Sequence, residues 1–193
     1  SANTTGTRNI AFGYQAYDAA DTENDNLAIG YDALGGSIAG GEFNVAIGNY
    51  SMDALTSGDK NTGVGYNTLT SNEDGEMNVA VGYEALYTNT SGDYNTAVGH
   101  KALEHNTTAS GNTATGYMSL LEVTTGVDNT AIGYRSGDIL TTGSNNVLIG
   151  DQTDPSAVAG TNQIVIGQGA TGHGNNIAVI GNGSATAIHP HDD

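Results

Sequence analysis

The sequence predicts an all-β fold, a parallel β-roll or β-solenoid of about eleven coils, and two observations carry this prediction. A nine-residue phrase, seen in full from Asn78 to Leu86, returns almost from end to end at a period of 17 residues. The composition has 29 glycines, no tryptophan and two phenylalanines, so its apolar content lies in small and β-branched residues. A short fixed period indicates one small unit stacked on itself, and this composition suits thin layers rather than a thick core.

An asparagine opens each copy and a glycine, called here the coil glycine, follows four residues later. The interval is 17 residues except for one of 18 between Gly30 and Gly48, and two degenerate copies follow at Gln163 to Gly167 and Ile177 to Gly181. The asparagines are Asn9, Asn26, Asn44, Asn61, Asn78, Asn95, Asn112, Asn129 and Asn146. We interpret them as a structural ladder of amides, in which each side chain hydrogen-bonds its neighbours above and below.

The residues between the asparagine and the coil glycine predict a short β-strand. Ile, Val, Leu or Thr usually flank a central alanine, which is replaced only by Gly63 and Leu148 among the nine copies. Because side chains alternate along a strand, one face is mostly β-branched and the other is small. We expect the coil to cover the β-branched face and the alanine face to remain bare for close approach of another backbone.

The rest of each period predicts a second strand and two turns. The second strand ends in a small residue and then a large one, as in Ala85-Leu86. Glycine often stands three residues before the next asparagine, as at Gly58, Gly75 and Gly92, and we expect these glycines to adopt positive φ. A helix is disfavoured by the glycines and β-branched residues. Coils stacked at ~4.8 Å would form a rod on the order of 50 Å long.

The charge balance limits the classes of partner. The net charge is −17, from 21 acidic and four basic residues, which argues against binding of nucleic acid. No apolar run is long enough to indicate membrane insertion, and the chain lacks cysteine. Because it begins at Ser1 without a methionine, we expect it to be a fragment or a processed piece.

A single coil cannot stabilise itself, which predicts an oligomer. It buries about three apolar side chains, too few to offset the ~1 to 2 kcal/mol of conformational entropy lost by each ordered residue. We therefore expect the alanine faces of several chains to pack around a common axis.

The phrase Asn-x-Ala-Ile/Val-Gly-Tyr-x-Ala-Leu, at Asn26 to Leu34 and Asn78 to Leu86, resembles the head repeats of trimeric autotransporter adhesins and related repeats of bacteriophage tail fibres. The resemblance covers roughly residues 9–185 and implies a homotrimer of left-handed parallel β-rolls. The period of 17 residues is more similar to the fibre branch. Residues 186–193, a tail after the 1–8 lead-in and the 9–185 roll, resemble segments that precede a self-cleaving intramolecular chaperone in phage fibres.

These features predict a structural or adhesive fibre segment rather than an enzyme, since no catalytic motif is found. The resemblance implies a phage tail fibre shaft or head in a virion, with a cell-surface glycan or protein as receptor. The alternative is the head of a bacterial surface adhesin, which would be extracellular. Less favoured are a tailspike glycan hydrolase with paired carboxylates and an ice-binding solenoid. The ice-binding hypothesis depends on the aligned residues Thr62, Thr96, Thr113 and Thr130.

Tyrosine often follows the coil glycine and predicts an aromatic stripe. Its members are Tyr14, Tyr31, Tyr66, Tyr83, Tyr117 and Tyr134. Stacked rings would stabilise the roll, and the alternative is a sugar-binding surface. Asn49, His100 and Asp151 occupy the same place in other copies and are expected to interrupt the stripe.

Two kinds of metal site are considered, although the chain is expected to need no cofactor. His189 and His191 of three chains could offer six imidazoles to an axial transition metal. Acidic residues of the turns could bind Ca²⁺ loosely, with solvated loop charge as the alternative. These residues are Asp25, Glu73, Asp74, Glu76 and Asp128.

Overall fold

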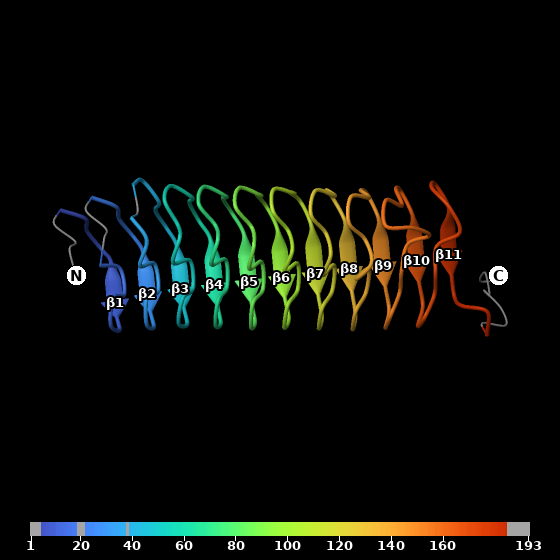
Figure 1. Ribbon diagram of the computed structural model, residues 1–193, viewed down its shortest axis with the longest axis horizontal. Coiled ribbons are helices and arrows are strands. Elements are labelled where there is room, and N and C mark those ends of the chain that lie inside the picture. The colour runs from blue at the N-terminus through green and yellow to red at the C-terminus, as the bar shows by residue number, and fades with distance from the viewer. Residues whose placement is uncertain (1–4, 19–21, 38, 185–193) are drawn as a thin grey trace, which may run out of the picture.

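The computed structural model describes residues 5–18, 22–37 and 39–184, and it is a β-solenoid (Figure 1). Eleven three-residue strands form one sheet, and no helix occurs in the described ranges. The strands are β1 (Ile10–Phe12), β2 (Leu27–Ile29), β3 (Val45–Ile47), β4 (Thr62–Val64), β5 (Val79–Val81), β6 (Thr96–Val98), β7 (Thr113–Thr115), β8 (Thr130–Ile132), β9 (Val147–Ile149), β10 (Ile164–Ile166) and β11 (Ala178–Ile180).

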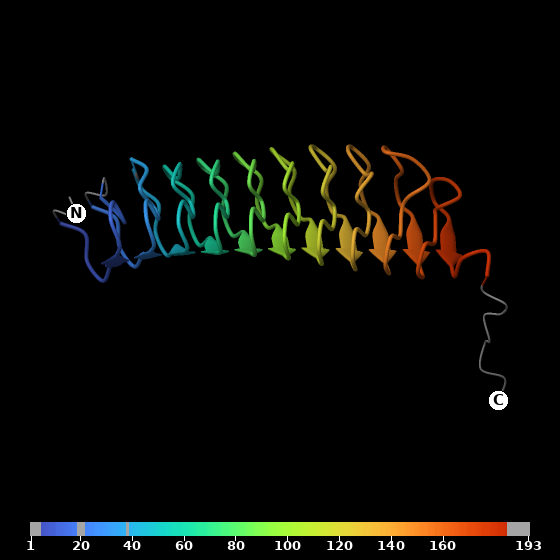
Figure 2. The ribbon, with the colours of Figure 1, turned by 60° about the horizontal axis from the view of Figure 1, so that its bottom comes forward.

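Each turn of the chain adds one strand to the sheet. The strands lie in sequence order and every pair is parallel, so that Val79 pairs with Thr96 and Ala80 with Ala97, each 17 residues further on. The strands line one side of the rod, and the turns project on the other side (Figure 2). The prediction of an all-β parallel solenoid with 17-residue coils is therefore confirmed.

The expectation of a second strand in each coil was wrong. After the coil glycine the chain makes a turn in which two alternate residues are left-handed, as at Glu84 (φ 53°) and Leu86 (φ 52°). Ala85 and Leu86 are adjacent and both fully buried, whereas neighbouring strand residues would point to opposite faces. The segment still bonds from coil to coil, since the Leu86 amide donates to the Ala102 carbonyl at 3.0 Å. This turn curls the chain around its own core.

The assignment of the two strand faces was also wrong. The central alanines, such as Ala80 and Ala97, are fully buried inside their own chain against residues of the turn. The flanking residues point outward, and Phe12 and Ile180 are 75% and 51% exposed. The alanine is small because the interior of one coil is narrow and the leucine of the turn fills it. The bare face of the sheet is therefore the β-branched face.

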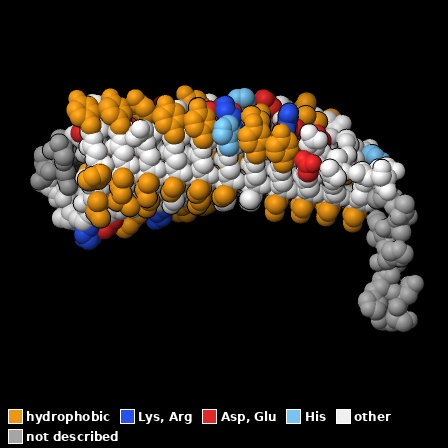
Figure 3. Space-filling view, turned by 90° about the horizontal axis from the view of Figure 1, so that it is seen from below, with side chains coloured by type: hydrophobic (Ala, Val, Ile, Leu, Met, Phe, Trp, Pro, Cys, Tyr) orange, Lys and Arg blue, Asp and Glu red, His pale blue; other side chains and the backbone are white. Residues whose placement is uncertain are grey.

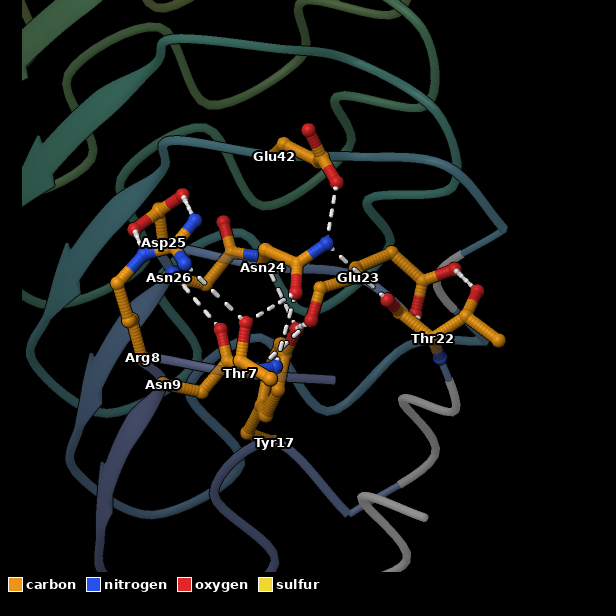
Figure 4. A network of polar contacts seen from close by, with 10 residues as sticks. All are labelled: Thr7, Arg8, Asn9, Tyr17, Thr22, Glu23, Asn24, Asp25, Asn26 and Glu42. Carbon is orange, nitrogen blue, oxygen red and sulfur yellow. Dashed lines mark hydrogen bonds and ion pairs between the residues drawn. The ribbon is translucent and has the colours of Figure 1, made fainter. Parts of the chain in front are cut away.

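The opening asparagines connect each coil to the next and close each coil on itself. The Asn9 Oδ1 accepts the backbone N–H of Asn26 at 2.9 Å, while its Nδ2 donates to the carbonyl of Glu23 at 2.7 Å (Figure 4). All nine asparagines make both bonds, to the next coil and to a carbonyl 14 or 15 residues ahead. The asparagine side chains of the ladder thus hydrogen-bond mainly to backbone groups and not only to one another.

A second amide ladder escaped the sequence analysis. The Asn106 Nδ2 donates to the Asn89 Oδ1, and the Asn89 Nδ2 donates to the Asn72 Oδ1, both at 2.7 Å. All three side chains are fully buried. Their spacing of 17 residues was visible in the sequence, but they lie in a variable turn outside the repeated phrase.

The glycines three residues before the asparagines do not adopt the positive φ that we expected. Gly58, Gly75 and Gly92 lie outside the left-handed region, which is taken instead by the residue before each asparagine, such as Lys60 (φ 58°). Close stacking explains the glycines, because a Cβ at Gly92 would lie 2.3 Å from the Ala109 carbonyl oxygen. The coil glycines require glycine for both reasons, positive φ and close stacking. Gly82 has φ 134°, and a Cβ added there would lie 2.4 Å from the Gly99 carbonyl oxygen.

The two exceptions to the central alanine are balanced by changes in the facing turn. Leu148 replaces alanine where the turn carries Gly137, and a Cβ on Gly137 would lie 2.6 Å from the Leu148 Cδ1. Gly63 replaces alanine beside Met52, whose Cε would lie 3.0 Å from an added Cβ. The interior keeps a nearly constant volume from coil to coil.

The substitution Asn95→Ala should destabilise the solenoid by about 2 to 5 kcal/mol. It leaves the buried Asn112 N–H and Ala109 carbonyl without their partners at 3.0 and 2.8 Å. Urea unfolding followed by circular dichroism measures the change, with the exposed Thr108→Ala as the control. Equal stability of the two variants would contradict the role of the asparagine.

The substitutions Gly137→Leu and Leu148→Ala should each destabilise the chain, and the double variant should recover most of the loss. The double variant restores the arrangement of the other coils, in which leucine already occupies the left-handed position at Leu120 (φ 50°). A double-mutant cycle on unfolding free energy should give a coupling of about 1 to 3 kcal/mol. Additive effects would show that the two positions do not share one space.

Candidate functional site

An aromatic ladder follows the coil glycines along the rod. It consists of Tyr14, Tyr31, Tyr50, Tyr66, Tyr83, His100, Tyr117 and Tyr134. Neighbouring ring centroids lie 5.0 to 5.9 Å apart, which is the distance range of favourable aromatic pairs. The six tyrosines predicted for the stripe are all members and are 40% to 71% exposed. The turn that follows each coil glycine sets their spacing.

Two of the three expected interruptions do not break the ladder. His100 stacks between Tyr83 and Tyr117, with interplanar angles of 15° and 21°. Asn49 turns its Oδ1 to the backbone N–H of Tyr31 at 2.8 Å, and Tyr50 supplies the ring in its place. Sequence reasoning missed Tyr50 because it stands one position later than the other rings.

Tyr50 is nevertheless oriented differently from its neighbours. Its ring is turned 67° from that of Tyr31 and 87° from that of Tyr66. These two neighbours are each stacked on the ring beyond, with angles of 15° and 12°. The faces of the Tyr31 and Tyr66 rings therefore point toward the neighbouring rings of the ladder. The plane of the Tyr50 ring instead runs parallel to the long direction of the ladder.

The outward residues of the strands form a second apolar row beside the ladder. Figure 3 shows two hydrophobic rows along the rod, separated by a pale band. The coil glycines, which lie between strand and ladder residues in the sequence, contribute no side chain to this surface. The exposed members of the strand row include Ile10, Phe12, Val98, Ile132, Ile164 and Ile180. This surface is apolar over most of the length of the rod.

Acidic pairs border the ladder on the side of the turn. In the middle of the rod, the Lys101 Nζ lies between two carboxylates, 2.9 Å from Glu84 and 2.7 Å from Glu104. These hydrogen bonds raise the pKa of Lys101. Burial opposes ionisation of Glu84, but hydrogen bonds from Lys101 and Tyr83 hold its pKa below the ordinary value. Lys101 therefore balances one of the two negative charges of the pair.

A second acidic pair, Asp138 and Asp154, stands beside Arg135 near the C-terminal end. Arg135 bonds Asp138 through its Nε at 2.5 Å, and both contribute to an open hollow with Asp154 and Gln152. Burial and then the charge of Asp138 raise the pKa of Asp154 to about 6. These are paired carboxylates of the kind that the hydrolase alternative requires, but Arg135 engages one of them in an ion pair.

A third pair, Asp32 and Asp53, lies beside Tyr50 and has no such cation. The ion pairs found in the described ranges involve Arg8, Lys101, His105 and Arg135, and none of them includes Asp32 or Asp53. The Asp53 Oδ1 is buried without a hydrogen-bond partner in the chain. Burial, followed by the charge of Asp32, raises the pKa of Asp53 to about 6.

The metal hypotheses receive no geometric support from the part of the chain that is described. There, no group of three His, Cys, Asp or Glu side chains is placed to hold a metal ion, and this includes the turn acids considered for Ca²⁺. Asp25 instead pairs with Arg8, whose Nη2 donates to its Oδ2 at 2.6 Å (Figure 4). His189 and His191 lie outside the described residues. Within the same ranges, no helix has the length and apolarity to cross a membrane.

The fold and surface define a repeat protein of the parallel β-solenoid class with a largely aromatic and apolar face. The chain matches no protein family model, no curated protein and no solved structure.

The substitution Asp53→Asn should stabilise the chain at pH 7.5 and weaken its pH dependence. Because the folded-state pKa of Asp53, about 6, lies above the ordinary 3.8, its contribution to stability is full below pH 4 and is lost as the pH rises through 6. Solvent screening of this half-buried group limits the gain to about 1 kcal/mol.

Urea unfolding between pH 4 and 8 measures this effect, with the exposed Asp74→Asn as the matched control. The two variants should differ above pH 6 and converge near pH 4. Parallel curves at every pH would contradict the unfavourable burial of the Asp53 charge.

Proposed function

We propose that the chain is a structural and adhesive fibre segment that works as a homotrimer, in the manner of a phage tail fibre shaft or head. The observation that carries this proposal is the outward sheet face, which is apolar over most of the solenoid and is partly or fully exposed in a single chain. Exposed apolar patches of this extent mark interaction sites in soluble proteins. The resemblance of the repeated phrase to fibre and adhesin repeats favours three chains.

The contact between chains is made by the outward strand residues and not by the alanines, which are already buried. The strip is narrow, because each strand contributes only two outward side chains, as Val79 and Val81 do in β5. A narrow strip suits convergence of three rods on one axis. The rods would then run parallel to the axis, so that each layer meets the same layer of its neighbours.

The composition of the strands fits such an axis. None of the eleven strands contains a charged residue, although the chain carries 21 acids. Where identical layers meet, any carboxylate would face its own copies, and like charges placed together cost several kcal/mol. The acids lie instead in the turns, where they keep the outer surface of a fibre solvated. The assembly would be a stiff spacer that carries or forms a receptor contact.

The substitution Val81→Asp should dissociate the trimer, because it places three carboxylates in one layer of the axis. Light scattering should give three times the 19.6 kDa chain mass for the wild type and one chain mass for the variant at the same concentration. The matched control is Val81→Thr, since threonine occupies the equivalent outward place at Thr115.

Circular dichroism of Val81→Asp should match the wild type, because each coil keeps its own buried core. A wild-type mass of one chain would overturn the proposal. So would a Val81→Asp variant that keeps the wild-type mass, which would place the contact on another face.

A further inference from the structure

The residue that immediately precedes the Asn position of each coil is left-handed along the described rod. Its φ lies between 53° and 74° from Arg8 to Asn176. Glycine, asparagine and aspartate adopt this conformation most readily. They fill the C-terminal half of the row, which consists of Gly111, Asp128, Asn145, Asn162 and Asn176. The first two members, Arg8 and Asp25, are joined to each other by an ion pair.

Four consecutive coils depart from this local preference with large side chains. We call these four residues the entry row, and they are Phe43, Lys60, Met77 and Tyr94. A bulky left-handed residue is unfavourable for the backbone. Burial does not offset this cost, because Phe43, Met77 and Tyr94 are 50%, 37% and 61% exposed. The chain by itself therefore does not explain these side chains, whereas a contact outside the chain does.

The charge of Lys60 also lacks a partner within the chain. Arg8, Lys101 and Arg135 each form an ion pair, but in the described ranges the exposed Lys60 ammonium makes no ion pair or hydrogen bond. Lys60 is one of only four basic residues in a chain of net charge −17. A second copy of the chain carries the same negative charge, so an exposed ammonium favours contact with it.

The entry row and the aromatic ladder lie on opposite sides of the same strands. Each entry residue stands two positions before its strand, and each ladder ring follows the strand after the coil glycine. In Figure 3, basic side chains lie along the lower edge of the rod, across the strand row from the ladder. The residues that flank β3, β4, β5 and β6 are Phe43 and Tyr50, Lys60 and Tyr66, Met77 and Tyr83, and Tyr94 and His100.

We propose that the entry row of one protomer packs against the aromatic ladder of its neighbour, strand by strand. This contact rests on the homotrimer proposed above, with its three rods parallel to one axis. Rotation about that axis keeps every strand at its own height, and it brings one edge of each rod to the opposite edge of the next. Each entry residue therefore meets the ring that flanks the same strand in the neighbouring chain.

The ladder presents ring edges to such a neighbour. Tyr83 is stacked between Tyr66 and His100, with interplanar angles of 12° and 15°, so neighbouring rings cover both of its faces. The edge of an aromatic ring carries positive charge and attracts the face of another ring or the sulfur of methionine. Met77 and Tyr94 supply these two groups, the first for Tyr83 and the second for His100.

Lys60 completes the contact at the height of Tyr66. The phenol oxygen at the edge of this ring accepts a hydrogen bond from the ammonium. Beyond β6 the row carries no large apolar or basic side chain, since Gly111 and Asp128 stand at the heights of Tyr117 and Tyr134. The contact is therefore confined to the layers of β3 to β6.

The first test uses engineered disulfides, because the chain has no cysteine of its own. The double variant Tyr94→Cys/His100→Cys places one thiol on each side of β6. Within one chain the stretch from Asn95 to Gly99 spans on the order of 13 Å, beyond the ~7 Å Cα separation that a disulfide bridges. Mild oxidation should therefore link different chains, giving mainly three-chain species on a non-reducing denaturing gel. The control Tyr94→Cys/Tyr134→Cys shifts one thiol by two strands, about 10 Å, and should remain mainly unlinked.

The second test is Tyr94→Asn, which introduces the residue that this row carries at Asn145. The concentration at which the trimer dissociates should rise at least about 10-fold, because an aromatic anchor is lost. The matched control Asp128→Asn lies in the same row outside the contact and should change that concentration less than about 2-fold. In the Val81→Asp background, the unfolding temperature of Tyr94→Asn should equal or exceed that of Val81→Asp alone, because asparagine suits the left-handed conformation. This opposite effect separates loss of the contact from loss of the fold.

The outcomes distinguish this contact from the trimer itself. A trimeric wild type whose Tyr94→Cys/His100→Cys variant links no better than the shifted control would overturn the contact and leave the trimer standing. Unchanged dissociation of Tyr94→Asn would do the same and would assign the entry row to a different partner. A wild type with the mass of one chain would overturn both.

Discussion

The structure depends on one buried amide that is repeated in every regular coil. The asparagine oxygen accepts the backbone N–H of the next coil, and its amide group donates across the coil to a carbonyl of the turn. A coil with a single three-residue strand has few backbone bonds of its own, so this side chain both closes the loop and sets the step to the next one. Without the asparagine these backbone groups would lack hydrogen-bond partners, which is costly because the site is fully buried.

Besides the asparagines, several other rows of equivalent residues run along the rod and contribute to its stability. Buried amides, alanines and leucines form the interior, and aromatic rings and β-branched residues form rows outside it. Each coil contacts mainly the coils before and after it, so local changes must be balanced locally. Gly137 beside Leu148 and Gly63 beside Met52 show this balance, since in each pair one residue shrinks where its neighbour grows.

The repeat also explains where specific chemistry can arise in such a fold. Regular positions build the rod, and a departure at one coil changes the surface without changing the core. In one coil Lys101 bridges Glu84 and Glu104, whereas in another Tyr50 stands beside Asp32 and Asp53, and the buried Ala46 of that coil is kept. The outward strand face differs from this surface, because it is uncharged along the rod and mostly β-branched, which suits contact with copies of itself.

The period of 17 residues and the alternation in Val79–Val81 were enough to predict the parallel stack, because stacking in register is the arrangement that such a repeat favours. The tyrosine stripe followed from the same spacing. The sequence could not show which face of the strand is inside, since alternation is symmetric until the turn is known. Only the tertiary structure decided this, because left-handed residues such as Glu84 and Leu86 curl the turn over the alanine and direct the leucine inward. The pairing of Asp32 with Asp53 across two coils likewise depends on that curl.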